Sequence, residues 1–224
     1  MCQFKSAIVL KEPRNKGGFQ LLMSPWTERH SDLIQMYNLK DDGRLKFARI
    51  EFCPPSLKTA HLVETYKLRI DEERCPDWFD EEMKSAVGEK MTAYIKSIIV
   101  SGDVNLLIGG QFIIAPNVKV QSTKACIINA MIDSNVGEMW ESSNVGEMWG
   151  SSNVGVMRES SNVGVMRESS NVGVMRGISN VGMMRESSNV GVMRGSSNVG
   201  EMWESSNVGV MWGSSKVNKD FRKK

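Results

Sequence analysis

The strongest pattern along the chain is a nine-residue repeat that begins at Ser134 and runs to about Ser215. Its unit reads S-S-N-V-G-x-M-[RW]-[EG], so apolar Val and Met recur at fixed places between polar residues. This period is too short for helix-pair repeats, which need over ~30 residues, and it does not fit a heptad coiled coil. Gly, Ser and Asn in every unit also disfavour a helix. We therefore expect a β-solenoid, a parallel β-helix of short strands and tight turns.

The fixed positions of the repeat have predicted roles. Val136, Met139 and their equivalents are expected to form two buried columns, because a stacked core needs apolar residues at the same place in every coil. Gly137 and its equivalents are expected at corners, and Ser and Asn are expected to hydrogen-bond between coils or at corners. The competing interpretation is a flexible Ser/Gly-rich repeat.

The number of repeat units in one coil stays open at this stage. Two units per coil would give about 4.5 coils and a rod of roughly 20 Å at the ~4.8 Å strand spacing. Three units per coil would give a shorter, triangular stack. The handedness of the coil stays open as well.

Residues 1–102 predict a small α+β domain. Residues 4–10 and 19–23 favour two strands joined by a turn at Asn15–Gly18. Residues 47–52 and 66–70 alternate apolar and polar side chains, which predicts two further strands with one solvated face each.

Two helices are expected in the same domain. Ser31 is the predicted N-cap of a short helix that ends near Leu39. The longest helix is predicted to start at Pro76, because apolar residues follow it at helical spacing. These residues are Phe79, Met83, Ala86, Val87, Met91, Tyr94, Ile95 and Ile98. We interpret the acidic run between Asp71 and Glu82 as a solvated helix start that favours the positive end of the dipole, and not as a metal site.

The predicted domain order places transition and end segments around the repeats. Residues 103–133 are interpreted as degenerate first coils that form the N-terminal cap of the solenoid, since Asn117-Val118 already follows the repeat phase. Residues 134–215 form the regular array. Residues 216–224 carry five basic residues and one Asp and are expected to form a basic C-terminal cap that blunts edge pairing.

Composition excludes several classes of protein. The chain has 224 residues with 28 Lys+Arg against 26 Asp+Glu, a balance that indicates neither a nucleic-acid nor a membrane partner. No apolar run approaches the ~18 residues of a membrane span. The 4 Cys include no C-x-x-C pair, so no metal and no cofactor is expected. We expect a cytoplasmic location.

Candidate catalytic residues are few. The chain contains no G-x-S-x-G, P-loop, G-x-G-x-x-G or H-E-x-x-H motif. The start of the chain, Met1-Cys2, resembles the start of class II glutamine amidotransferases, which begin Met-Cys-Gly-Ile. In this chain Gln3 and Phe4 follow Cys2. The resemblance implies an N-terminal nucleophile at Cys2. His30 and His61 are the candidate acid–base groups, and surface or loop histidines are the alternative interpretation.

The variable columns of the repeat supply the candidate binding residues. The residue after Met is Trp at both ends of the array and Arg in the middle: Trp140, Trp149, Arg158, Arg167, Arg176, Arg185, Arg194, Trp203 and Trp212. We expect stacking to align Trp140 with Trp149 and Trp203 with Trp212 as apolar patches that contact another protein, most simply a second copy of this chain. Residues 134–215 contain 5 Arg and 8 Glu, net −3, which argues against a phosphate-binding stripe.

The whole chain resembles a group of uncharacterised bacterial and phage proteins, in which a small N-terminal domain precedes S-S-x-V-G-x-M-[RW]-[GE] repeats. That resemblance rests on the repeat unit and on the Phe47–Pro55 segment, and it implies a microbial or phage origin without an activity.

Three hypotheses for function follow. The first is a non-enzymatic binding or assembly protein, with the solenoid as a rigid spacer or as a surface for self-association or a protein partner; a phage- or host-directed inhibitor belongs to this class. The second is an enzyme with its site at Cys2 or His30. The third is nucleic-acid binding through the Arg column and the basic tail.

Overall fold

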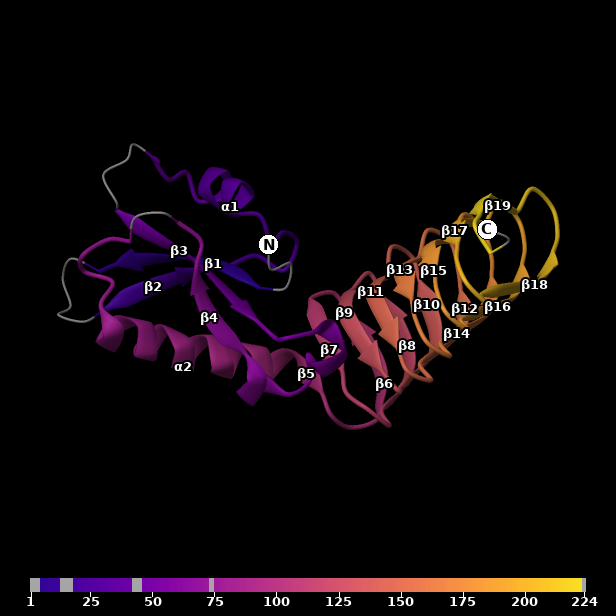
Figure 1. Ribbon diagram of the computed structural model, residues 1–224, viewed down its shortest axis with the longest axis horizontal. Coiled ribbons are helices and arrows are strands. Elements are labelled where there is room, and N and C mark those ends of the chain that lie inside the picture. Colours follow the sequence, from indigo (N-terminus) through magenta and orange to yellow (C-terminus); the bar gives the residue numbers. More distant parts are fainter. Residues whose placement is uncertain (1–4, 13–17, 42–45, 73–74, 223–224) are drawn as a thin grey trace. The chain divides into compact units, whose positions relative to one another are not determined.

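The computed structural model describes residues 5–12, 18–41, 46–72 and 75–222, and the chain divides into two compact units, Met1–Ser97 and Ile98–Lys224 (Figure 1). The first unit combines a sheet with helices, and the second is a parallel β-solenoid. The predicted fold class, an α+β region followed by an all-β solenoid, is therefore confirmed.

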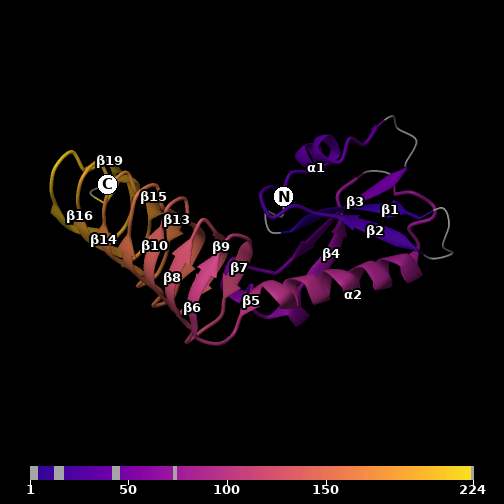
Figure 2. The same ribbon diagram turned by 180° about the vertical axis from the view of Figure 1, so that it is seen from behind.

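The first unit is built on a four-stranded antiparallel sheet in the order β2-β1-β3-β4. Its strands are β1 (Ser6–Lys11), β2 (Phe19–Leu22), β3 (Phe47–Cys53) and β4 (Lys67–Ile70), and two short 3₁₀ helices, η1 (Leu57–Thr59) and η2 (Val63–Thr65), lie between β3 and β4. Figures 1 and 2 show α1 (His30–Met36) and α2 (Glu81–Ile98) on opposite faces of this sheet. Leu33 of α1 packs with Ile8 and Phe47.

Three local expectations for this unit need correction. The N-cap of α1 is Arg29 and not Ser31, because an extended residue 29 and a Thr27–Asp32 hydrogen bond of 2.6 Å define the start of the helix. Helix α2 begins at Glu81 and not at Pro76, because the Asp80 carboxylate accepts the Met83 N–H at 2.9 Å and so caps the first turn. Strand β3 has no solvated face: it lies between β1 and β4, and Glu51 is 7% exposed.

The second unit consists of two parallel sheets between which the chain alternates. The seven-stranded sheet contains β6 (Val104–Ile108), β8 (Lys119–Lys124), β10 (Asn135–Trp140), β12 (Asn153–Met157), β14 (Asn171–Met175), β16 (Asn189–Met193) and β18 (Asn207–Met211). The eight-stranded sheet contains β5 (Ile99–Val100), β7 (Gln111–Ile114), β9 (Ile127–Ile132), β11 (Asn144–Trp149), β13 (Asn162–Met166), β15 (Asn180–Met184), β17 (Asn198–Met202) and β19 (Lys216–Asp220). The described residues therefore form about seven coils.

Each coil takes two repeat units. Asn135 pairs with Asn153, and Val136 pairs with Val154, so equivalent residues of one sheet lie 18 positions apart. The same offset joins Asn144 to Asn162 in the other sheet. Consecutive repeat units therefore lie on opposite sheets, which settles the question that the sequence left open between two and three units per coil.

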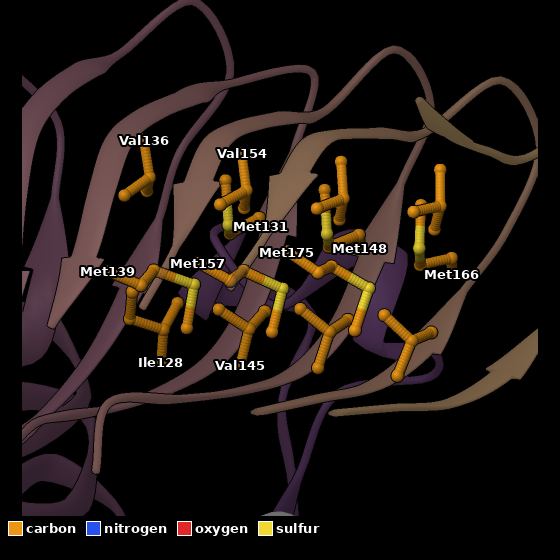
Figure 3. Close-up of a cluster of buried hydrophobic side chains, with 14 of the residues drawn as sticks. Ile128, Met131, Val136, Met139, Val145, Met148, Val154, Met157, Met166 and Met175 are labelled. Atoms are coloured by element: carbon orange, nitrogen blue, oxygen red, sulfur yellow. The ribbon is translucent and has the colours of Figure 1, made fainter. Parts of the chain in front are cut away.

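The Val and Met columns form the solenoid core, as predicted. Val136 to Val199 and Met139 to Met202 are 0–1% exposed in the first eight units, whereas in the last unit Val208 is only partly buried and Met211 is 42% exposed. Figure 3 shows the Met side chains of both sheets, such as Met139 and Met148, reaching into the space between the sheets, with Val145 and Val154 beside them. Flexible thioethers fill a gap of this kind without voids.

The glycine that follows each Val does not lie at a corner, contrary to the expectation. Gly155 and its equivalents lie within strands, and a Cβ on Gly155 would lie 2.5 Å from the carbonyl oxygen of Gly137 in the preceding coil. A side chain is excluded there because the backbones of successive coils approach so closely.

The corners are formed by the last position of the unit, where Glu or Gly stands. Glu159 (φ 53°) and Gly177 (φ 70°) have left-handed backbone conformations, as do their equivalents. The second Ser of each unit is buried inside the turn, and the Ser161 hydroxyl donates to the Arg158 carbonyl oxygen at 2.7 Å. Asn side chains bond from coil to coil, as between Asn171 Nδ2 and Asn153 Oδ1 at 2.8 Å. The predicted hydrogen bonding is thus seen for Asn between coils and for Ser143, Ser152 and Ser161 at the turns. The buried hydroxyls of the later units have no partner among the described residues: Ser170, Ser179, Ser188, Ser197 and Ser206.

Segments on either side of the regular array continue the same ladders. Residues 99–132 supply β5 to β9 with irregular sequences, including a register shift at Phe112/Ile113. Strand β19 pairs with β17, places Asp220 opposite Met202 and Lys219 opposite Glu201, and is followed by Phe221, which stacks on Trp203 at 4.2 Å.

Candidate functional site

The two candidate catalytic histidines have different surroundings. His30 bridges two acceptors: its Nδ1 lies 3.0 Å from Asp71 Oδ2 and its Nε2 lies 3.0 Å from the Ile50 carbonyl oxygen. Both ring nitrogens therefore contact acceptors that tie the start of α1 to the sheet. His61 Nδ1 is buried without a hydrogen-bond partner among the described residues, and burial lowers the pKa of its imidazole.

The cysteines give no described nucleophile. Cys2, the candidate N-terminal nucleophile, lies outside the described residues. Of the described cysteines, Cys53 is disulfide-bonded, whereas Cys75 and Cys126 are free. Burial raises the pKa of both free thiols, which disfavours the reactive thiolate. In the described part of the chain, no group of three or more His, Cys, Asp or Glu side chains is arranged to hold a metal ion.

The nine candidate binding residues lie at the ends of the solenoid strands, on two opposite sides of the coil. This follows from the topology, because each coil has two strands and two turns. We define the arginine edge as the turns that follow strands of the seven-stranded sheet, with Arg158, Arg176 and Arg194 in one column. We define the glutamate edge as the turns that follow strands of the eight-stranded sheet, with Glu168, Glu186 and Glu204 in one column.

The Trp pairs expected from the sequence are separated by this arrangement. Trp140 and Trp212 lie on the side of the arginine edge, and Trp149 and Trp203 lie on the side of the glutamate edge. Members of an expected pair are nine residues apart and so belong to different sheets. The expected alignment within each pair is therefore wrong. Each Trp instead lies in a column with the residues 18 positions away on its own side of the coil.

On the side of the glutamate edge, Trp and Arg side chains contact neighbouring residues within the coil stack, although Trp149 Nε1 and Arg167 Nε are buried without a hydrogen-bond partner among the described residues. Arg167 lies over the Trp149 ring at 4.7 Å and its Nε lies 3.4 Å from Glu147. Arg185 Nε donates to the Met183 sulfur at 2.9 Å. Trp203 Nε1 donates to Glu201 Oε2 at 3.2 Å, besides stacking on Phe221.

The Glu side chains of the glutamate edge also accept hydrogen bonds from backbone N–H groups. The Glu168 N–H donates to Glu186 Oε2, and the Glu186 N–H donates to Glu204 Oε2 at 2.7 Å. Each carboxylate thus caps the equivalent turn of the coil before it. This bond offers a physical reason for Glu at a left-handed backbone position that usually favours Gly.

On the arginine edge, Arg158 is the only one of the three Arg that has a carboxylate partner among the described residues. Arg158 lies over the Trp140 ring at 4.4 Å and its Nη2 lies 3.0 Å from Glu138, a bond that lowers the pKa of the Glu138 carboxyl. Arg176 and Arg194 are exposed, and no carboxylate among the described residues lies within ion-pairing distance of either. Here Gly177 and Gly195 stand where the other edge has Glu.

Exposed apolar side chains gather on the same side of the solenoid. Ile178 is 64% exposed and Trp212 is 62% exposed. Within the described solenoid, every large apolar residue that is exposed belongs to the seven-stranded sheet or to its turns: Leu106, Ile108, Trp140, Ile178, Val210, Met211 and Trp212. The eight-stranded sheet has no such residue in its described part, so the two sides differ although their repeats are alike.

Sequence reasoning missed two members of this surface. Ile178 replaces the Ser found at this position in the other units. From Glu168 onward the Glu/Gly column separates by sides when it is read every 18 residues, whereas Glu141 and Glu159 precede it on the arginine edge and Gly150 precedes it on the glutamate edge. Both signals are in the sequence. They acquire meaning only when two units are assigned to one coil.

A hollow of about 380 Å³ lies farther along the seven-stranded sheet, near its first strands. It is lined by residues that include Asp103, Lys119, Asn135 and Gly137. The Lys119 N–H donates to Asp103 Oδ1 at 2.8 Å. The hollow brings together none of the candidate catalytic residues.

The comparisons with known proteins identify no relative of this chain, so the solenoid surface is interpreted from its own residues. No family model, no curated protein and no solved structure matches the chain. No helix in the described residues is long and apolar enough to cross a membrane. The expected cytoplasmic location stays a prediction, and the disulfide at Cys53 is more typical of an oxidising compartment.

Proposed function

We propose that this chain is a non-enzymatic binding protein whose solenoid contacts a protein partner through the arginine edge. The observation that carries the proposal is the exposed cluster of Arg176, Arg194, Ile178 and Trp212 on one side of the coil stack. Trp and Arg are enriched at the centres of protein interfaces, and an apolar patch with unpaired cations matches a surface that gains contacts on binding.

The rival functions have less support. For the enzyme hypothesis, both ring nitrogens of His30 are already engaged. For nucleic-acid binding, residues 134–215 carry 5 Arg against 8 Glu, and the arginine edge has only two Arg, Arg176 and Arg194, without a carboxylate partner among the described residues. A protein surface is the target that accounts for both the cations and the apolar side chains.

Photo-crosslinking tests the proposal. A p-benzoylphenylalanine at position 178 would sample the arginine edge, and the same residue at Met36, an exposed position of α1 in the first unit, serves as the control. We expect position 178 to capture a defined partner protein in the source cell and position 36 to capture none. Equal capture at both positions, or none at either, would contradict the proposal.

A double variant tests the same surface without a probe. Ile178→Ser with Trp212→Arg gives both positions the residues that equivalent units already use, so the coil is preserved. We expect this variant to lose the crosslinked or co-purified partner. Trp203 is not a suitable target, because it stacks on Phe221 and its replacement would disturb β19.

A further inference from the structure

The two sides of the solenoid are complementary in charge over the same stretch of coils. Residues 171–178, 189–196 and 207–214, which are strands and turns of the seven-stranded side, contain two Arg and no acid, net +2. Residues 162–169, 180–187 and 198–205 on the other side contain two Arg and four Glu, net −2. Over these three coils the chain therefore carries a basic side and an acidic side of equal and opposite charge, whereas residues 135–142 and 153–160, which precede them on the seven-stranded side, contain one Arg and three Glu.

The two columns also have the same spacing. Arg176 and Arg194 are 18 residues apart and belong to strands that pair directly, and the same holds for Glu186 and Glu204. One rung therefore corresponds to one strand separation, ~4.8 Å, on both edges. When two solenoids lie side by side with parallel axes, Arg176 and Arg194 of one can meet Glu186 and Glu204 of the other at successive coils.

Local geometry leaves both columns accessible. Arg176 and Arg194 are exposed beside Gly177 and Gly195, which carry no side chain to hold a neighbour away. Glu186 and Glu204 are exposed too. Their Oε2 atoms accept backbone N–H groups of the preceding coil, which fixes the carboxylates in a row, and a carboxylate can accept further hydrogen bonds from a guanidinium.

We infer that the partner of the arginine edge is the glutamate edge of a second copy of this chain. This inference rests on the proposed function and names its partner. The contact uses different surfaces on the two copies, so it is heterologous and does not close on itself. Parallel solenoids would associate laterally into rows, and because the paired charges lie at the surface, salt would weaken the rows.

Charge reversal on each edge tests the inference. Arg176→Glu/Arg194→Glu makes both edges acidic, and Glu186→Arg/Glu204→Arg makes both edges basic. By sedimentation velocity at low salt, we expect the unmodified protein to form oligomers that dissociate at high salt. Each variant alone should sediment as a monomer, and an equimolar mixture of the two should associate again. The charge-conserving Arg176→Lys/Arg194→Lys is the control and should still associate.

A second pair of variants keeps the test valid if reversal disturbs folding. Glu186→Gln/Glu204→Gln keeps a side-chain oxygen for the backbone N–H groups while it removes the charge, and it should also lose association. Circular dichroism and thermal unfolding check that each variant keeps its coil stack.

Failure of the inference and failure of the proposed function give different results. If the unmodified protein stays monomeric while position 178 crosslinks to a different protein, the second-copy inference is wrong and the binding function stands. If association occurs but persists in both charge variants, the Arg–Glu pairing is wrong. If position 178 captures nothing and the protein stays monomeric, both are wrong.

Discussion

Within each repeat unit, Val and Met are three residues apart and yet both point into the core. Strict strand alternation would place them on opposite faces. The intervening Gly and x residues are both half-buried at most repeats, so the strand carries two outward positions in succession between its two inward ones. The Gly backbone lies against the equivalent Gly of the preceding coil, which is why this position tolerates no side chain.

The first prediction concerns this Gly column. In Gly173→Ala the new Cβ would lie 2.6 Å from the Gly155 carbonyl oxygen, so the two coils must move apart. We expect the free energy of unfolding to fall by ~1–3 kcal/mol, the usual cost of overpacking, as measured by urea unfolding. Val174→Ala, which changes the half-buried outer residue next to it, is the control and should cost less. Equal losses for the two variants would show that the close approach carries no special cost.

A second prediction concerns His61 and pH. Burial lowers the pKa of the His61 imidazole from its ordinary value of 6.5, so between the two pKa values the unfolded chain binds more protons than the folded one. Stability attributable to this group is therefore fully present above pH 6.5 and is lost as the pH falls through that value towards the lower folded-state pKa.

The measurement compares urea unfolding of the unmodified protein with that of His61→Gln between pH about 8 and about 5. The carboxylates titrate in both proteins, so the difference between them isolates His61. We expect the loss of stability on acidification to be smaller in the variant. An identical pH dependence would rule out the buried imidazole as its source.

At the scale of elements, the sequence was sufficient to predict a solenoid but not to decide how many repeat units form one coil. A nine-residue period with Val and Met at fixed places requires a stacked core, and the observed columns are buried as expected. Two or three units per coil would bury those columns equally well. The choice is made by the turns: a left-handed residue at the Glu/Gly position and a buried Ser after it reverse the chain.

The candidate site was predictable to the same degree. The residues that the repeat varies, Trp and Arg, lie at strand ends, but their grouping depends on which units share a side. Reading the column every nine residues placed Trp203 beside Trp212, whereas reading it every 18 residues places Trp212 beside Arg194. The catalytic candidates failed for another reason: the partners of His30 lie 20 and 41 residues away and cannot be inferred from its own segment.

A third prediction belongs to strand β19. Its sequence is irregular, and Phe221 stacks on Trp203 directly after it. Phe221→Ala removes this contact, worth ~0.5–1.5 kcal/mol beyond the area it buries, so β19 should open more often. Hydrogen exchange should show faster exchange of β19 amides with little change in β10 to β15. Trp212→Ala is the control: among the described residues Trp212 has no ring partner, so its loss should leave β19 exchange unaltered.

Over the whole molecule, the solenoid behaves as a row of interchangeable 18-residue modules. Each coil contacts mainly its two neighbours, so stability should be approximately additive along the axis. The module also carries the surface chemistry, because one coil contributes one rung to each edge. Coil number therefore sets the length of the rod and the number of paired charges together.

The last prediction uses this coupling. Duplicating residues 171–188 inserts one full coil, keeps every later unit on its own sheet, and adds an Arg176 equivalent to the arginine edge and a Glu186 equivalent to the glutamate edge. Small-angle scattering should show a rod longer by ~4.8 Å. Lateral association at low salt should strengthen, because one more pair forms per contact. A matched insertion with Gln for the added Arg and Gly for the added Glu should lengthen the rod equally without that gain. If both insertions associate alike, rod length and not paired charge controls assembly.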